Sequence, residues 1–551
     1  MATHFGAQSV APDEIQASTT AFQAMESDGL HKATPAMEGT AHDRSDMHRL
    51  GKIQEFKRNF RPLAALSFSA VLQATWEFIL ISNSQGLENG GLAGLFWSFV
   101  WTCVGFGFII VSLAEMASMS PASGGEFQWV SEFAPAGQQR FLSYTTGRQL
   151  QPTAHFLADD LRMDVGARLA GWSCFGVFSH VLSSPQIPGL ITIQNPNYHA
   201  QNWQGTLFVW AMIAIIYYFN VHAASWMPRI QNLLLALHLM CWVVVIVVLY
   251  AVAPHNSSKV VFTEFYNGGG WPTVGVSLMI GQISAIYGSL SADATAHIAE
   301  EVKDAGRYVP IAIAWGYIGN GILALVVIIG LILAMPLPLS DALEDDTGFP
   351  FLYVFRKTVS KAGVNGLTAI ILIPVIFSNI LFNASTARQT YAFARDNGLP
   401  FARWLSYVDP RRHIPVRAIA LSCLISGLLS IINIGSSVAF NAIISLNVAA
   451  LMYTYAVALS CVIYRKMRYP ETLPPRRWSL GGTGLLINII GLLYVCFAFF
   501  WSFWPPKPST TAHDFNWSVV IFVVVFVISL MMYMFQGRKH YVGPVAAVRR
   551  D

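Results

Sequence analysis

One segment of this sequence places ionisable side chains at the end of an apolar run long enough to enter a membrane. Within residues 284–310, Asp293, His297 and Glu301 are spaced four residues apart, so on a helix they would share one face. The preceding residues 287–291 (YGSLS) are poor helix formers. Two structures fit this pattern: a broken transmembrane helix whose freed backbone groups hold a solute, or a glycine-containing span followed by a polar loop.

The first apolar run also carries polar side chains near its middle, in the order Gln73-Ala74-Thr75-Trp76-Glu77. A carboxylate inside a membrane is costly, and such residues usually serve function. We therefore interpret Glu77 as functional, the alternative being a protonated or hydrogen-bonded carboxyl near the outer end of a tilted helix. A later run has a polar seam that includes Ser378, Asn379 and Asn383, which hydrogen bonds between helices explain as well as substrate contact does.

Acidic and basic side chains gather where several of the apolar runs end on one side of the membrane. Those that could form a gate of ion pairs are Glu115, Asp293, Glu300, Glu301, Arg388 and Arg395. Such pairs would break as a pathway opens. A solvated rim of charges fits the same pattern equally well.

Enzymatic and nucleic-acid functions find little support in the sequence. His297-x-x-Glu300 resembles half of a metal site, but no second ligand pair stands nearby at zinc spacing, and there is no GxSxG motif. The net charge is only +4, without a basic tract interleaved with aromatics, which argues against nucleic acid as a partner. The six cysteines lie in or near apolar runs and form no CxxC. We predict no enzyme, no cofactor and no bound metal.

The composition indicates an all-α polytopic protein with the lipid bilayer as its solvent. Only 12% of the 551 residues are charged, whereas soluble domains carry about 25%. Windows of about 20 apolar residues, each sufficient for one crossing, recur eleven times. They lie near 62–84, 91–117, 205–225, 229–253, 272–298, 309–335, 364–387, 416–434, 437–464, 482–505 and 515–536.

The loops between these runs alternate between rich and poor in lysine and arginine, which places both termini in the cytoplasm. Arg148 and Arg229 fall on the same side only if two crossings lie between them, so a twelfth, atypical crossing is needed. The best candidate for this third span is Leu169–Ile193, which contains two prolines. We expect a disordered cytoplasmic tail over 1–60, a transmembrane domain over 61–536 and a cytoplasmic tail over 537–551.

Three long motifs resemble the fungal branch of the amino acid–polyamine–organocation superfamily, which comprises amino acid, 4-aminobutyrate and choline permeases. The first is SLAEMASMSPASGGEFQWVSEFAP at residues 112–135. The second, DATAHIAEEV, begins at Asp293, and the third, ARQTYAFARDNGLP, occupies 387–400. They occur in the order that the family has, within a resemblance that covers about 62–536.

The resemblance implies a fold of about twelve helices with two inverted five-helix repeats, at 61–253 and 271–465, and two extra helices at 482–536. It also implies a solute site where spans one and six unwind, with span eight nearby. Carried onto this chain, the site comprises Ala74, Thr75, Trp76, Glu77, Ser284, Tyr287, Gly288, Ser289, Ser291 and Asn379. Its gating and coupling residues would be Glu115, Asp293, Glu300 and Arg388.

The activity implied is proton-coupled uptake of a small nitrogenous solute at the plasma membrane, with solute and protons as partners. A solute carboxylate would sit at a half-helix N-terminus. Trp76 and Tyr287 would cap the site or stack on a quaternary ammonium, and Glu77 is the expected proton carrier.

The chain departs from the family after Tyr144-Thr-Thr-Gly147. A charged stretch with prolines, 148–188, stands where the family continues into an apolar third span, as a shifted reading frame or a retained intron would produce. The third span borders the solute site in this fold. The departure therefore motivates an alternative function, that of a non-transporting nutrient sensor or inactive permease relative.

Overall fold

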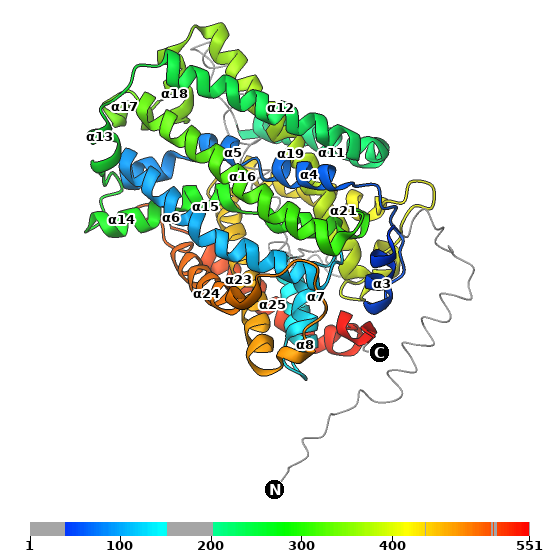
Figure 1. The fold of residues 1–551 in the computed structure, drawn as a ribbon. Helices are drawn as coiled ribbons and strands as arrows, with labels where there is room; N and C mark the ends of the chain where they lie inside the picture. Colours follow the sequence, from blue (N-terminus) through cyan, green and yellow to red (C-terminus); the bar gives the residue numbers. More distant parts are fainter. Residues whose placement is uncertain are drawn as a thin grey trace.

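The computed structural model describes residues 39–150, 202–345, 347–435, 437–508, 511 and 515–549 (Figure 1). Throughout these residues the secondary structure is helical, apart from one isolated bridge between Phe60 and Val302. Ten helical stretches in this part of the chain are long and apolar enough to cross a membrane, and the shorter α21 (Val416–Ser430) is an eleventh apolar helix. They match the eleven predicted runs in order. The predicted crossing at 169–193 lies outside the described residues.

The first span consists of two helices, α4 (Pro62–Gln73) and α5 (Thr75–Ile81), and the second is α6 (Ser84–Met119). Between the second and third spans lie the short α7 (Glu126–Phe133) and α8 (Gln139–Leu150). The next two spans are α11 (Asn202–His222) and α12 (Met227–Val247). The sixth predicted span begins with α14 (Val274–Gly281), continues in α15 (Ile283–Ser289) and ends in the 3-10 helix η3 (Ala292–Glu301).

The remaining spans are mostly continuous helices. They are α16 (Ala305–Ala334), α19 (Lys361–Arg395), α21, α23 (Ser437–Arg468), α24 (Gly484–Trp501) and α25 (Ser518–Met532). Two interrupted helices, the first and the sixth predicted spans, thus stand at the heads of the two predicted repeats. The repeat boundaries themselves stay predictions.

The first span is the most enclosed element of the bundle. In its most apolar part 94% of the residues are buried inside the molecule, against 22% for the stretch that contains α25. Helices α12 and α16 both pack against α4. Large apolar side chains such as Leu233, Met240 and Leu493 are instead exposed on the outside, as expected where lipid replaces water.

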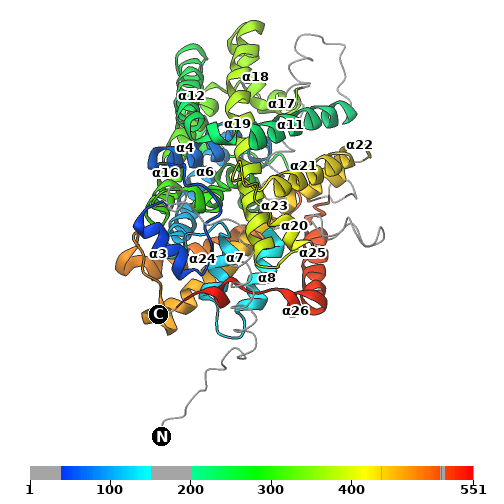
Figure 2. The same cartoon turned by 90° about the vertical axis from the view of Figure 1, so that its right-hand side faces the viewer.

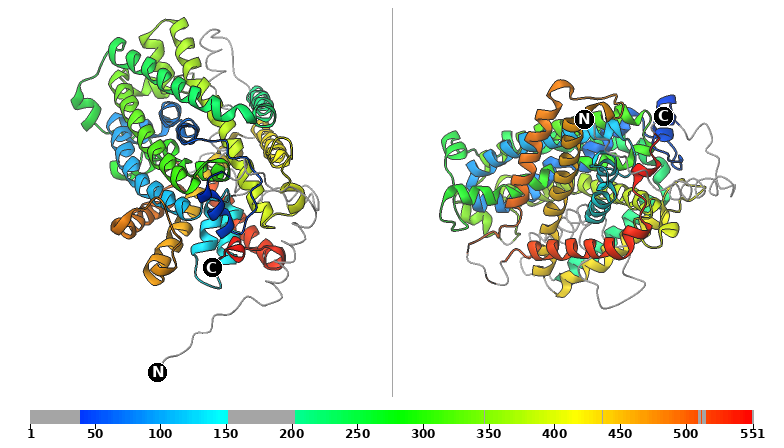
Figure 3. Two further views of the ribbon diagram at one scale, coloured as in Figure 1. Left: turned by 45° about the vertical axis from the view of Figure 1, so that its right-hand side comes forward. Right: turned by 90° about the horizontal axis from the view of Figure 1, so that it is seen from below.

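Peripheral helices surround this centre. Helices α11 and α21 lie side by side (Figure 2), where Thr206 Oγ1 donates a hydrogen bond to the Ser430 carbonyl at 3.0 Å. Helix α25 crosses α23 (Figure 3), with the rings of Tyr453 and Phe522 5.9 Å apart. The central helices are therefore shielded from lipid on several sides.

The prediction of disorder through residue 60 is wrong for residues 39–60. A helix, α3 (Ala41–Arg49), begins at Thr40 with a capping box, and the segment after it buries Phe56 and Phe60. The low apolar content of this region predicts a free tail. Its order arises instead from long-range contacts with η3, because Phe60 N donates to the Glu301 carbonyl and Lys303 N donates to the Phe60 carbonyl, both at 3.0 Å.

Candidate functional site

The first span is interrupted at Ala74. This residue adopts a left-handed backbone conformation, with φ 40° and ψ 42°, between the end of α4 and the start of α5. That conformation costs roughly 1–2 kcal/mol for a residue with a Cβ atom. Strain of this kind is kept where the surroundings hold it, commonly at functional sites.

The interruption of the sixth span lies at Leu290 and Ser291. Leu290 is extended, and Ser291 is left-handed with φ 71°, so the helical path stops at Ser289 and resumes at Ala292. The chain therefore breaks within the region that its poor helix formers indicated. It then continues as a 3-10 helix, so the predicted α-helical face does not form. Glu301 contacts a different partner from Asp293 and His297.

Gly288 allows the two interrupted helices to approach closely. A Cβ atom on Gly288 would lie 2.7 Å from Ile79 Cδ1 and 3.6 Å from the carbonyl oxygen of Thr75. Helices α5 and α15 are thus in contact next to both breaks. The predicted site residues Thr75 and Gly288 come together here.

Several buried polar groups around the first break have no hydrogen-bond partner within the described part of the chain. They are Gln73 Oε1, Thr75 Oγ1, Trp76 Nε1, Glu77 Oε2 and both amide atoms of Asn379. All of these side chains are almost fully buried. Buried polar groups in proteins are nearly always paired, so a cluster of unpaired ones indicates a place for a polar molecule.

Glu77 is one end of a chain of hydrogen bonds that joins four helices. Its Oε1 lies 2.7 Å from His238 Nδ1 on α12, and His238 Nε2 lies 3.2 Å from Asn320 Oδ1 on α16. Asn320 Nδ2 in turn donates to the Ala70 carbonyl on α4 at 2.9 Å. The network holds α5 against α12 and α16 and leaves the second carboxylate oxygen of Glu77 unpaired.

Other predicted site residues make structural hydrogen bonds. Ser284 Oγ accepts from Gly86 N at 3.0 Å, and Ser289 Oγ donates to the Ala285 carbonyl. Ser378 Oγ donates to the Leu72 carbonyl at 2.5 Å, and Asn383 Nδ2 donates to Ser422 Oγ at 3.0 Å. Most of the polar seam thus links helices, while Asn379 stays without a partner among the described residues. Tyr287 is half-buried, and Ser291 is buried at the break itself.

Two buried ion pairs join η3 to α19. Arg395 binds both carboxylate oxygens of Glu300, at 2.8 and 3.0 Å, and Arg388 Nε donates to Glu301 Oε1 at 2.5 Å. The side chain of Glu300 is fully buried. The predicted gate residues Glu300 and Arg388 therefore lie in adjacent ion pairs, with different partners.

The other two predicted gate residues lie apart from these pairs. Glu115 on α6 pairs with Lys466 at 2.5 Å and with Arg476 at 3.3 Å. Asp293 accepts a hydrogen bond from the Tyr455 hydroxyl and contacts no arginine in any ion pair of the described residues. The four predicted gate residues therefore lie at three separate sites and not at one.

The ordered N-terminal segment covers the η3 end of this assembly. Arg58 donates to the Ala299 and Val302 carbonyls at 3.0 and 2.6 Å, and it pairs with Asp43 at 3.2 Å. Burial opposes ionisation of Asp43, but Arg58 and the backbone amides of Thr40, Ala305 and Asp304 outweigh it and hold the pKa of this carboxyl below its usual range. The segment is thereby latched to the C-terminal end of the 3-10 helix and to the start of α16.

The C-terminal residues end beside the same segment, as the red and dark blue parts of Figure 1 show. Arg549 N donates to the Arg49 carbonyl at 2.8 Å, and the Tyr541 hydroxyl lies 2.6 Å from Ser143 Oγ on α8. The described ends of the chain therefore meet at one end of the molecule, the end that carries the ion pairs.

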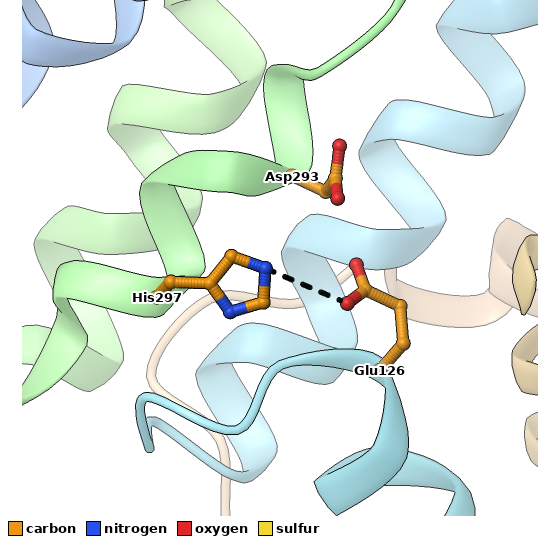
Figure 4. Close-up of side chains that lie close together, drawn as sticks. All are labelled: Glu126, Asp293 and His297. Carbon is orange, nitrogen blue, oxygen red and sulfur yellow. Dashed lines mark ion pairs between the residues drawn. The ribbon is translucent and has the colours of Figure 1, made fainter. Parts of the chain in front are cut away.

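A second buried cluster comprises Glu126, Asp293 and His297, which the pattern analysis did not bring together (Figure 4). One ligand-type atom from each lies within 4.8 Å of the others, and His297 Nε2 is 3.8 Å from Glu126 Oε2. His297 Nδ1 lies 3.0 Å from the Ser123 carbonyl. The signal that could have identified Glu126 is its charge in the otherwise uncharged motif SGGEFQW.

The sequence pattern also did not identify His238 and Asn320 as site residues. Each is a polar residue within a long apolar run, a feature that predicts function or pairing for any intramembrane side chain. The apolar run alone does not show which side chains on other helices they hydrogen-bond.

Two interrupted helices in contact, with unpaired polar groups beside the first break, are typical of a polytopic membrane transporter. A family model of amino acid permeases matches residues 59–526, and the chain belongs to this family. The resemblance, the helical fold class and the absence of an enzyme function that we predicted are confirmed by this match.

Relatives cover nearly the whole chain. An uncharacterized amino-acid permease of Schizosaccharomyces pombe is 27% identical over 90% of this chain and 88% of its own length. A choline transporter of Saccharomyces cerevisiae is 24% identical, with 93% and 88% covered. Amino-acid permease 2 of Neurospora crassa is 24% identical, with 93% and 91% covered.

Proposed function

We propose that this protein is a secondary active transporter that couples proton movement to the uptake of a small nitrogenous solute across the plasma membrane. The observation that carries the proposal is the set of unpaired buried polar groups beside two facing helix breaks. A solute placed there would supply the missing partners. The solute classes are amino acids and choline, which the family and its relatives name, and 4-aminobutyrate, which the sequence resemblance implies.

The site we propose consists of the residues carried over from the family, with Ala74, Thr75, Trp76 and Glu77 on one side. A primary ammonium group would donate to the unpaired Glu77 Oε2, whereas a quaternary ammonium has no N–H and would need an aromatic face such as Trp76 or Tyr287. Thr75 and Asn379 offer a hydroxyl and an amide to a solute carboxylate. Each solute class would thus use a different subset of these groups.

The Glu300–Arg395 and Glu301–Arg388 pairs are the gate in this proposal, at the cytoplasmic end. Arg49 and Arg549 are in contact at that end, so the two described ends of the chain lie together, as the proposed cytoplasmic location of both termini requires. Opening the pathway toward the cytoplasm would require η3 to separate from α19, which breaks both pairs.

Uptake by the purified full chain in proteoliposomes tests the function. We expect labelled choline, 4-aminobutyrate or one of a panel of amino acids to accumulate when the outside is made acidic. Binding of a solute without accumulation at any proton gradient would contradict transport and support the non-transporting sensor instead.

Replacing Asn379 by alanine should raise the KM for the transported solute about 2–10-fold, because one net hydrogen bond is worth about 0.5–1.5 kcal/mol. The maximal rate should change less, since no ion pair is touched. Ser460→Ala is the matched control, because its exposed hydroxyl on α23 bonds only its own helix at Ala456. An unchanged KM in Asn379→Ala for every transported solute would remove Asn379 from the site.

A further inference from the structure

The cluster of Glu126, Asp293 and His297 joins an element outside the spans to the interrupted sixth span. Glu126 is the first residue of α7, and Asp293 and His297 are on η3, just after the break at Ser291. All three side chains are buried. Figure 4 shows them converging on a common space between the two elements.

The backbone around the cluster is built to hold His297 close to α7. Gly125 has φ +57°, and a Cβ atom there would lie 2.5 Å from His297 Cε1. Ser123 contacts η3 twice, since its carbonyl faces His297 Nδ1 and its N–H donates to Glu300 Oε1 at 3.1 Å. A carbonyl only accepts, so Nδ1 is the protonated nitrogen of the neutral ring and Nε2 presents a lone pair toward Glu126.

Glu126 itself is unsatisfied. Neither of its carboxyl oxygens has a hydrogen-bond partner among the described residues, although the side chain is fully buried. Asp293 is held by the Tyr455 hydroxyl of α23, and no lysine or arginine forms an ion pair with Glu126 or Asp293 in the described chain. Two carboxylates enclosed without a cation cannot both ionise cheaply.

A proton on Glu126 resolves this arrangement. The protonated carboxyl becomes a donor with two acceptors in front of it, the Asp293 carboxylate and His297 Nε2. Burial, and then the charge of Asp293, hold the pKa of Glu126 well above its usual range. The titratable groups that face it are Asp293 and His297 on η3 and Tyr455 on α23; on α7 itself, Glu132 is paired with Arg49.

We propose that Glu126, together with Asp293 and His297, is the binding site of the proton that drives transport. The inference rests on the proposed function and names its coupling site. Loss of the proton would leave two facing carboxylates that repel each other and push η3 away from α7. Because η3 begins directly after the break at Ser291 and carries the gate residues Glu300 and Glu301, deprotonation would act on the solute site and the gate together.

A metal ion is the competing occupant of three such ligands. Its ligands would have to be deprotonated, and three side chains leave a divalent ion short of the four ligands of a closed structural site. The proton makes its own demand on the geometry. A hydrogen bond between Glu126 Oε2 and His297 Nε2, now 3.8 Å apart, requires the two side chains to move slightly closer. Chelation therefore forms one arm of the test.

The test compares the wild type with Glu126→Gln, which mimics the protonated carboxyl, in proteoliposomes with the membrane potential clamped at zero. In the wild type, an acidic exterior should drive accumulation of the labelled solute. In Glu126→Gln, this accumulation should fall at least 10-fold, to the level without a gradient. Exchange of labelled for unlabelled solute at equal pH should stay within about twofold. Glu264→Gln, which changes an exposed carboxyl, is the control and should behave as wild type.

The outcomes separate the two proposals. A wild type that exchanges solute but ignores the pH gradient would overturn both proton coupling and this site. If uptake by Glu126→Gln still responded to the pH gradient, the site alone would be overturned. Loss of that response in Glu77→Gln would then assign the proton to Glu77. Wild-type uptake abolished by a chelator and restored by Zn²⁺ would overturn the proton in favour of a metal.

A second measurement needs no solute. Because the pKa of Glu126 is raised on folding, its contribution to stability is fully present below the ordinary value of 4.5 and is lost as pH rises through the raised value. The Tm of the wild type should therefore fall relative to that of Glu126→Gln as pH increases from 5 to 9. Parallel Tm profiles for the two proteins would overturn the assignment.

Discussion

Replacing Arg395 by glutamine will lower the free energy of unfolding by about 3–5 kcal/mol, the usual cost of leaving a buried charge without its partner. Arg395 holds both oxygens of the fully buried Glu300. Its loss leaves that carboxylate with one backbone donor, Ser123 N. Chemical denaturation in mixed micelles measures the change.

The control for this prediction is Arg356→Gln. Arg356 also binds a carboxylate, that of Asp345, at 2.9 Å, but its side chain is 37% exposed. Exposed pairs contribute about 0–1 kcal/mol, so this variant should remain close to wild type. If both variants lost the same small amount, the Glu300–Arg395 pair could not be a strong latch between η3 and α19.

Replacing His238 by leucine will have a comparable effect, about 3–5 kcal/mol, and will also impair uptake. His238 is the hydrogen-bond partner of Glu77 Oε1 and links α12 to Asn320 on α16. Without it, both oxygens of a buried carboxylate lack partners, and α5 loses the contact that holds it beside the break at Ala74. Thermal unfolding and solute uptake of the same preparation measure the two consequences.

A double variant distinguishes the effect of losing the hydrogen bond from the effect of losing side-chain packing. Glu77→Leu combined with His238→Leu removes both polar partners, and replacing a buried pair by apolar groups is often neutral. The double variant should therefore be more stable than His238→Leu while uptake stays low. Additive losses would mean that the two side chains do not interact in the folded protein.

The first helix break was expected only from the family resemblance, which implies that spans one and six unwind. The polar residues Gln73, Thr75 and Glu77 mark its place, and the chain breaks at Ala74 between them. The second break was predictable only to within a few residues. The sequence from Tyr287 to Ser291 is uniformly poor in helix formers, and contact with α5 decides that the chain leaves the helix at Leu290.

The order of residues 39–60 could not be predicted from composition. Polar residues dominate the N-terminal region, and only a few apolar ones, such as Phe56 and Phe60, distinguish this part of it. Its order depends on hydrogen bonds from Arg58 and Phe60 to backbone groups near η3, about 240 residues further along the chain. Such partners are not visible in a local window.

The sequence alone determined that this protein enters a membrane, where its helices lie and which family it belongs to. Lipid cannot form hydrogen bonds with the backbone, so any apolar run long enough to cross it must form a helix, which pairs its own N–H and C=O groups. The apolar run alone therefore predicts the helix. The tertiary structure decided which buried polar side chains meet. Glu77 and His238 are 161 residues apart in the chain, and only the packing of α12 against the first span brings them to 2.7 Å. A hydrogen bond requires its two heavy atoms to lie within about 3.2 Å of each other, so these pairings depend on three-dimensional contacts that no single segment encodes.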